Sequence, residues 1–125
     1  MPCLQFDTTA SPTAEEKRAF ADAVTELYAE VMETETSHVG VTIRLRDHAE
    51  MSLGRADDGA LLFLDARIRR GRPFDLKREF ATAVIEAAAD RFGVPRDNAK
   101  VVFTEHEGEE IMGYERVGGS WDGAE

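Results

Sequence analysis

The chain has a single cysteine, Cys3, and only three lysines among its 125 residues. One cysteine excludes an intrachain disulfide framework and indicates a reducing compartment. The longest apolar run, residues 60–64, is far too short to cross a bilayer, and the first residues lack the basic and apolar segments of a signal peptide. We therefore expect a cytoplasmic protein with no membrane partner.

Positive charge is also scarce, because 15 Lys and Arg face 25 Asp and Glu and the net charge is −10. Nucleic-acid binding draws on clustered cations, so this acidic balance argues against a nucleic-acid partner. His38, His48 and His106 show no spacing typical of a metal site. No glycine-rich phosphate loop and no paired-cysteine motif is present either. We expect a protein that works without a metal or cofactor.

The chain does contain an internal repeat. Residues 17–29 align without a gap with residues 77–89, and eight of the thirteen pairs are identical. The flanks repeat at a similar spacing, since strand-like segments precede each predicted helix (2–7 and 60–68) and follow it (39–46 and 100–104). We therefore interpret residues 1–125 as one domain with pseudo-repeats at about 1–59 and 60–117, followed by a flexible tail at 118–125.

Each half reads β-α-β, with a helix long enough to cross over between parallel strands. The predicted fold class is α/β, with a four-stranded sheet and both helices on one face. Ser11–Pro12 or a capping box at Thr13 marks the start of the first helix, and Gly93 the end of the second. Residues 50–53 suggest a short extra strand. The apolar residues 61–64 leave the second face of the sheet in need of cover, which favours assembly into an oligomer.

Pro2 is the first candidate for chemistry. If Met1 is removed, Pro2 becomes a free secondary amine, whose pKa of about 8 falls further when the amine is buried. Such an amine serves as a general base or as a nucleophile towards a carbonyl. The alternative is a passive strand start, where proline costs nothing.

Four arginines within six residues form the second feature: Arg67, Arg69, Arg70 and Arg72. They follow the predicted central strand of the second half and open into a helix, where α/β sheets habitually bind ligands. Arginine matches a carboxylate with two parallel hydrogen bonds, so the cluster suggests a small organic anion. Salt bridges to the many surface carboxylates are the competing explanation. We add Tyr28, Glu110 and Tyr114 as residues that would line the pocket.

The combination of Met1–Pro2, two β-α-β units and an arginine-bearing loop resembles the tautomerase superfamily. The resemblance implies a catalytic amino-terminal proline and a homotrimer. Residues 69–77 look most like the cis-3-chloroacrylic acid dehalogenase group, with its pattern Arg-x-Gly-Arg-x-x-Asp-Leu-Lys. The resemblance assigns Arg69 and Arg72 to the substrate carboxylate and leaves Arg70 without a catalytic role.

This sequence departs from the dehalogenase group at three positions. Tyr28 stands where that group has a histidine, and the positions of its water-activating Tyr and Glu hold Val102 and Gly113. Glu110, Tyr114 or Glu115 would have to replace them. The related malonate semialdehyde decarboxylases carry an acidic residue near the position of Ser37.

We therefore hypothesise a cofactor-free tautomerase or isomerase of a small enolisable 2-oxo acid. Pro2 would act as general base and acid, and Arg69 and Arg72 would hold the carboxylate. One alternative is a hydratase, dehalogenase or decarboxylase of a C3 acid. Another is a trimeric binding protein without catalytic activity.

Overall fold

The computed structural model of the protein describes residues 1–119, so residues 120–125 of the predicted tail lie outside the described part. Two β-α-β units follow one another, as predicted, and their helices begin sixty residues apart. Short 3-10 turns separate some of these elements. The strands and helices are β1 (Cys3–Thr8), α1 (Ala14–Val31), β2 (Gly40–Leu45), β3 (Leu62–Arg69), α2 (Phe74–Phe92) and β4 (Ala99–His106).

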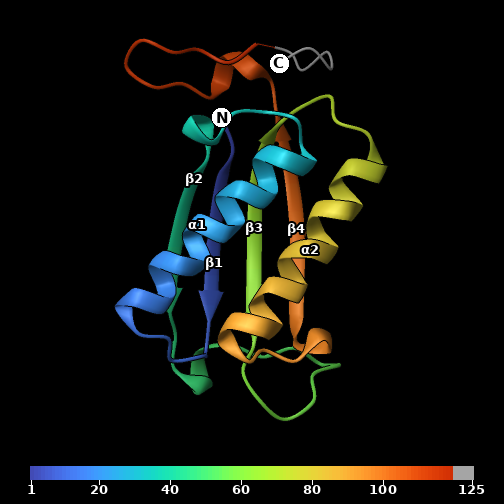
Figure 1. The fold of residues 1–125 in the computed structure, drawn as a ribbon. Coiled ribbons are helices and arrows are strands. Elements are labelled where there is room, and N and C mark those ends of the chain that lie inside the picture. Colours follow the sequence, from blue (N-terminus) through green and yellow to red (C-terminus); the bar gives the residue numbers. More distant parts are fainter. Residues whose placement is uncertain (120–125) are drawn as a thin grey trace.

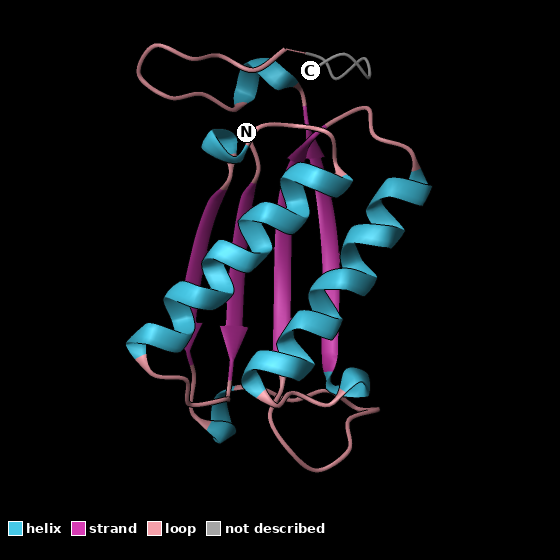
Figure 2. Ribbon diagram, in the orientation of Figure 1, coloured by secondary structure: helices cyan, strands magenta, loops and turns pink. Residues whose placement is uncertain are grey.

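The four strands form one sheet in the order β2-β1-β3-β4. Within each unit the two strands are parallel, whereas β1 and β3 pair antiparallel at the centre of the sheet. Both helices lie on the same face, which gives a layer of helix over a layer of sheet (Figures 1 and 2). The predicted α/β fold class is confirmed. No helix among residues 1–119 is long and apolar enough to span a membrane.

Local sequence sets the helix ends. Thr13 caps α1, because its side chain accepts a hydrogen bond from the Glu16 amide and Glu16 reaches back to the Thr13 amide. The Ser11–Pro12 alternative is therefore wrong. Gly93 ends α2 in the left-handed conformation with φ 68°, as the sequence predicts.

The core lies between the helices and the sheet. Alternate residues of the central strands point under the helices, among them Leu4, Phe6, Leu62 and Leu64. Phe6 meets Phe20 of α1 edge-on at 5.0 Å between ring centroids. Apolar residues at helical spacing thus close one continuous core against one face of the sheet.

The second face of the sheet is more polar than the sequence predicts. Leu62 and Leu64 are both buried in the core, so their apolar character says nothing about the opposite face. On that face Asp7 accepts hydrogen bonds from Arg44 and Arg46, each at 3.0 Å, and the Arg44 bonds lower the pKa of Asp7. The expected strand at residues 50–53 is also wrong. A 3-10 turn at His48–Glu50 with its own capping box precedes irregular chain there.

Candidate active site

The two candidate features from the sequence meet at one edge of the sheet. Because β1 and β3 are antiparallel and Cys3 pairs with Arg67, the start of β1 lies beside the end of β3. Pro2 is buried there, and its carbonyl accepts a hydrogen bond from the Gly40 amide at 3.0 Å. The N-terminus, the β3–α2 loop and the C-terminal segment gather at this end of the molecule (Figure 1).

Arg69 is the last residue of β3, and only 8% of it is exposed. Its Nη1 donates a hydrogen bond of 2.7 Å to the carbonyl of Gly119. The guanidinium group is thus held at the C-terminal end of the strand, next to the segment that folds back over it.

Arg72 is buried more deeply, with 5% exposed. Its Nε donates to the Met32 carbonyl at the end of α1 at 2.8 Å, and its guanidinium carbon lies 5.9 Å from the centroid of the Tyr28 ring. Burial lowers the pKa of Arg72. Contacts with α1 therefore fix the position of this cation before any ligand binds.

The other two arginines of the cluster are exposed. Arg70 pairs with Glu107 at 2.9 Å, and both side chains are more than half exposed. Arg67 is exposed on the second face of the sheet. The competing explanation of surface salt bridges thus holds for Arg70, whereas Arg69 and Arg72 are buried cations beside the N-terminus.

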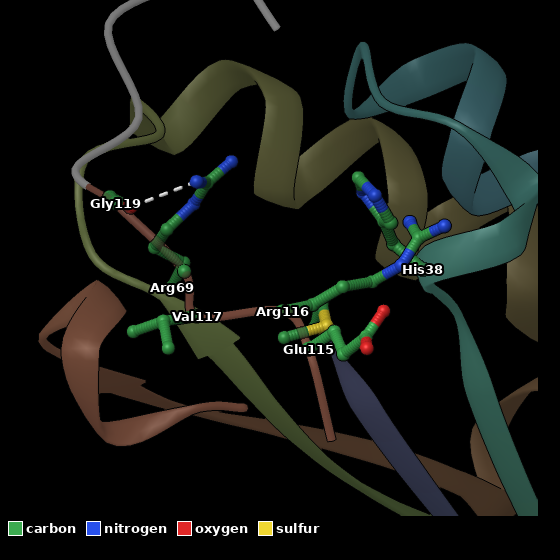
Figure 3. A pocket seen from close by; sticks show the side chains of 8 residues that line it. His38, Arg69, Glu115, Arg116, Val117 and Gly119 are labelled. Carbon is green, nitrogen blue, oxygen red and sulfur yellow. Dashed lines mark hydrogen bonds between the residues drawn. The ribbon is translucent and has the colours of Figure 1, made fainter. Parts of the chain in front are cut away.

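A cleft of about 280 Å³ opens beside the N-terminus (Figure 3). One wall is a turn in the C-terminal segment, where Met112 pairs with Val117 and the Gly113 amide bonds to the Arg116 carbonyl at 2.7 Å. Gly108 packs against the backbone of Gly119 with no room for a Cβ atom, which lets the segment approach Arg69. The residues that line the cleft are Met1, His38, Arg69, Glu115, Arg116, Val117, Gly118 and Gly119.

The charges of this region act on the terminal amine. Burial, and then the charges of Arg69 and Arg72, lower the pKa of the Met1 amine from 8.0 to about 6. Burial, the terminal amine and Arg116 likewise lower the pKa of His38. An amine at this place is uncharged at neutral pH, which is the state a general base needs.

We expect the amine of the chain that retains Met1 to titrate near pH 6 in the folded protein and near 8.0 when unfolded. Because the unfolded state binds more protons in this interval, the amine makes stability rise with pH between the two values. Reductive methylation with ¹³C-formaldehyde, followed by NMR titration of the methylamine, measures the midpoint, with the Lys17 amine as internal control. A folded-state midpoint near 8 would contradict the environment described.

Residues 2–60, which form the first β-α-β unit, match the family described as Tautomerase enzyme. This match covers 59 of the 125 residues, just under half of the chain. No curated protein matches its sequence. The family match of the first β-α-β unit agrees with the resemblance to the tautomerase superfamily noted in the sequence.

Solved structures of this superfamily share the fold. A member of the cis-3-chloroacrylic acid dehalogenase family, N1, is 22% identical with a TM-score of 0.83, and the match covers 94% of this chain and 84% of that one. FG41 malonate semialdehyde decarboxylase inhibited by 3-bromopropiolate is 21% identical with a TM-score of 0.78, covering 91% of each chain. The W0 fused 4-OT symmetric trimer is 18% identical with a TM-score of 0.80, covering 94% and 97%. These similarities show the fold alone. The three proteins have different names, a dehalogenase family member, a decarboxylase and a fused 4-OT, so the fold does not select one activity.

Three residues that the sequence suggested as pocket lining do not line this cleft. Tyr28 is 1% exposed and packs edge-on against Phe80 at 5.1 Å, and burial raises its pKa to about 12. Glu110 bonds to the Glu107 amide at 3.1 Å and lines a separate hollow with Cys3. Tyr114 is 101% exposed. None of the three lines the cleft beside the N-terminus.

The sequence analysis did not predict that His38 and Arg116 line the cleft. From the C-terminal segment it named only Glu115 among the residues that do. His38 lies in a 3-10 turn after α1, where Thr34 Oγ1 is 3.3 Å from its Nδ1. Its position two residues before β2, whose start pairs with the start of the parallel β1, was the available signal. Arg116 is the one Lys or Arg after Lys100, and its contrast with the acidic residues around it was the available signal.

Glu33 directly follows Met32, whose carbonyl holds Arg72, and has a positive φ of 57°. A side chain in this left-handed conformation costs about 1–2 kcal/mol, part of which glycine recovers. We therefore expect Glu33→Gly to raise the free energy of unfolding by about 0.5–1 kcal/mol, measured by chemical denaturation. Glu35→Gly is the matched control and should destabilise, because Glu35 has an ordinary φ of −93°. Equal losses in the two variants would show that the backbone at Glu33 is unstrained.

Proposed function

We propose that this chain is a cofactor-free tautomerase of a small enolisable 2-oxo acid, with Pro2 as the general base and acid after removal of Met1. The observation that carries the proposal is the buried terminus beside two buried guanidinium groups, which lower the pKa of an amine at that place. A neutral amine next to an anion-binding pair is the minimum set for moving a proton beside a carbonyl.

In this proposal the substrate carboxylate binds Arg69, and the charge of Arg72 adds to the attraction. A carboxylate is a stronger acceptor than a backbone carbonyl, so it can displace Gly119 from Arg69. The bound 2-enol gives its hydroxyl proton to the neutral Pro2 amine, which delivers a proton to C3, and the ketone forms. The amine returns to its neutral state, so the cycle consumes no other reactant.

The rate of ketonisation of an aryl enolpyruvate tests this function, and the loss of the enol absorbance measures that rate. Intact mass spectrometry of the same sample reports whether Met1 is absent. We expect turnover above the buffer rate in a sample that lacks Met1. A sample lacking Met1 that accelerates no 2-oxo acid would sink the proposal, and a chain isolated with Met1 intact would favour a binding protein.

A second candidate reaction is the addition of water to a C3 acid, as in a hydratase or a hydrolytic dehalogenase. The observation that favours it is Glu115, a carboxylate in the wall of the same cleft. A carboxylate near the bound acid can remove a proton from attacking water. Chloride release from 3-chloroacrylate that disappears in Glu115→Gln, while ketonisation persists, would distinguish this reaction from the tautomerase.

We further propose that the protein works as a cytoplasmic homotrimer. The fused 4-OT structure that shares its fold is a symmetric trimer. The face of the sheet away from the helices bears the Asp7–Arg44 pair together with exposed Val102, a mixture suited to a specific contact between copies. Light scattering coupled to size exclusion should give three times the chain mass of 13.9 kDa, and a monomer would refute the trimer.

A further inference from the structure

The imidazole of His38 lines the cleft and has no part in the reaction as proposed. His38 belongs to the turn between α1 and β2, and its side chain is 23% exposed. Arg69, which ends β3, lies across the cleft from it (Figure 3). An acid bound at Arg69 therefore has the imidazole on the opposite side of the cleft.

Contacts within the turn hold the His38 ring. Thr34 Oγ1 lies 3.3 Å from Nδ1, and the Thr34 amide donates to the Ala29 carbonyl near the end of α1 at 3.1 Å. The backbone thus fixes the hydroxyl that meets Nδ1. Nε2 lies 3.9 Å from the Glu35 carboxylate, which is too long for a hydrogen bond. In the described part of the chain, Nδ1 is the ring nitrogen that is hydrogen-bonded, and Nε2 is open to a ligand.

The imidazole is uncharged at neutral pH. Burial lowers the pKa of His38 from 6.5, and the charges of the terminal amine, Arg116 and Arg69 lower it further. Glu35 acts in the opposite direction. A neutral imidazole has hydrogen on one ring nitrogen and a lone pair on the other. When the Thr34 hydroxyl donates to Nδ1, the hydrogen lies on Nε2.

A neutral N–H donor suits a carbonyl oxygen. The substrate carboxylate has a full charge and binds best to arginine, whereas the oxygen at C2 gains charge only as the enolate forms. A fixed donor at that oxygen stabilises the developing charge and keeps its own proton. Among the described residues that line the cleft, His38 has the one polar side chain without a charge at neutral pH.

This inference rests on the proposed function and deepens it. We propose that His38 Nε2 donates a hydrogen bond to the oxygen at C2 of the bound acid, while Arg69 holds the carboxylate. The enol proton still passes to the Pro2 amine and a proton returns to C3, so the balance of the reaction is unchanged. His38 stabilises the oxygen while it carries negative charge and is thereby a catalytic residue. The site then favours acids with an oxygen at C2 over the same acids without it.

Calorimetric titration of the isolated protein with two unreactive acids tests this contact. Trimethylpyruvate has an oxygen at C2 and no hydrogen at C3, so it cannot enolise, and tert-butylacetate has the same carbon skeleton without that oxygen. At pH 7.5 we expect trimethylpyruvate to bind roughly fivefold more tightly, because it forms one additional hydrogen bond. His38→Leu should remove this preference and leave the affinity for tert-butylacetate unchanged.

Two further variants separate the hydrogen bond from the shape of the ring. His38→Gln keeps a neutral N–H donor at about the reach of Nε2 and should retain part of the preference. Thr34→Val removes the hydroxyl that sets the tautomer and should lose part of it. His48→Leu is the matched control. His48 is an exposed histidine beyond the far end of β2, so this variant should keep the full preference.

Equal affinities for the two acids in the natural chain would overturn the inference, as would binding of neither acid. A preference that survives His38→Leu, or an equal loss for both acids in that variant, would also overturn it. If His38→Leu does not fold, an undiminished preference in Thr34→Val has the same consequence.

Since neither probe reacts, the result is independent of turnover. A chain that prefers trimethylpyruvate through His38 and turns over no 2-oxo acid keeps this contact and loses the proposed tautomerase function. Turnover without the preference leaves the function in place and removes the contact.

Discussion

The chain that keeps Met1 should convert an enolisable 2-oxo acid roughly 10²–10⁴-fold more slowly than the chain with a free Pro2 amine. In the longer form, the Pro2 nitrogen belongs to a peptide bond, which neither accepts nor carries a proton at neutral pH. The free amine of this form is that of Met1, which lines the cleft and lies one residue further along the chain from the Pro2 nitrogen. The two forms differ by one residue, so kcat/KM for each, on samples verified by intact mass, isolates the contribution of the amine.

Folding serves as the control for this comparison. Pro2 is buried and its carbonyl bonds to Gly40, contacts that do not depend on Met1, so the two forms should unfold at similar temperatures. If the form that retains Met1 is equally stable and equally active, Pro2 is not the base. Below the pKa of the amine, kcat/KM of the active form should fall as pH falls, because the protonated amine cannot accept a proton. Burial and the nearby arginines place that fall below pH 8.

The fold could be predicted because its signals are local and repeated. The match between residues 17–29 and 77–89 fixed the spacing of the helices, and α1 and α2 indeed begin at Ala14 and Phe74. Capping at Thr13 and the glycine at position 93 depend on neighbouring residues alone. A sequence pattern predicts such features because they depend on interactions between residues that are close together in the chain.

The environment of the arginines could be predicted in part. The resemblance to the dehalogenase pattern separated Arg69 and Arg72 from Arg70, and the structure buries the first two and exposes the third. The absence of alternation over residues 61–64 misled us about the second face of the sheet, because this apolar run contains two core residues, Leu62 and Leu64, together with Phe63, which is not in the core. A continuous run does not state which of its members face the helices.

The opposite wall of the cleft could not be predicted. Arg116 reaches the cleft through a turn held by backbone hydrogen bonds between Gly113 and Arg116 and between Gly118 and Ile111. Almost any sequence can form these backbone hydrogen bonds, and the segment has no hydrophobic periodicity from which its path could be predicted. Tyr114, in the same turn, points fully into solvent. Both residues are exposed, and the turn alone decides that Arg116 lines the cleft whereas Tyr114 does not.

Arg69→Gln should weaken the binding of any carboxylate substrate by roughly 2–5 kcal/mol, which is at least thirtyfold in KM. Arg69 lines the cleft and is 8% exposed, so its interaction with a carboxylate is screened little by water. Glutamine retains donors but removes the charge and the paired geometry. Because the loss falls on the carboxylate that all substrates of this class share, it should affect every carboxylic acid tested.

Steady-state kinetics of Arg69→Gln beside Arg70→Gln provides the measurement. Arg70 lies in the next position and pairs with Glu107 at the surface, so its replacement should leave KM within about twofold. Arg72→Gln adds a second distinction, since Arg72 bonds to Met32 and contacts the Tyr28 ring. That variant should lose folding stability as well as affinity, whereas Arg69→Gln should lose mainly affinity. An Arg69→Gln protein with an unchanged KM would remove Arg69 from the site and leave Arg72 as the carboxylate ligand to be tested.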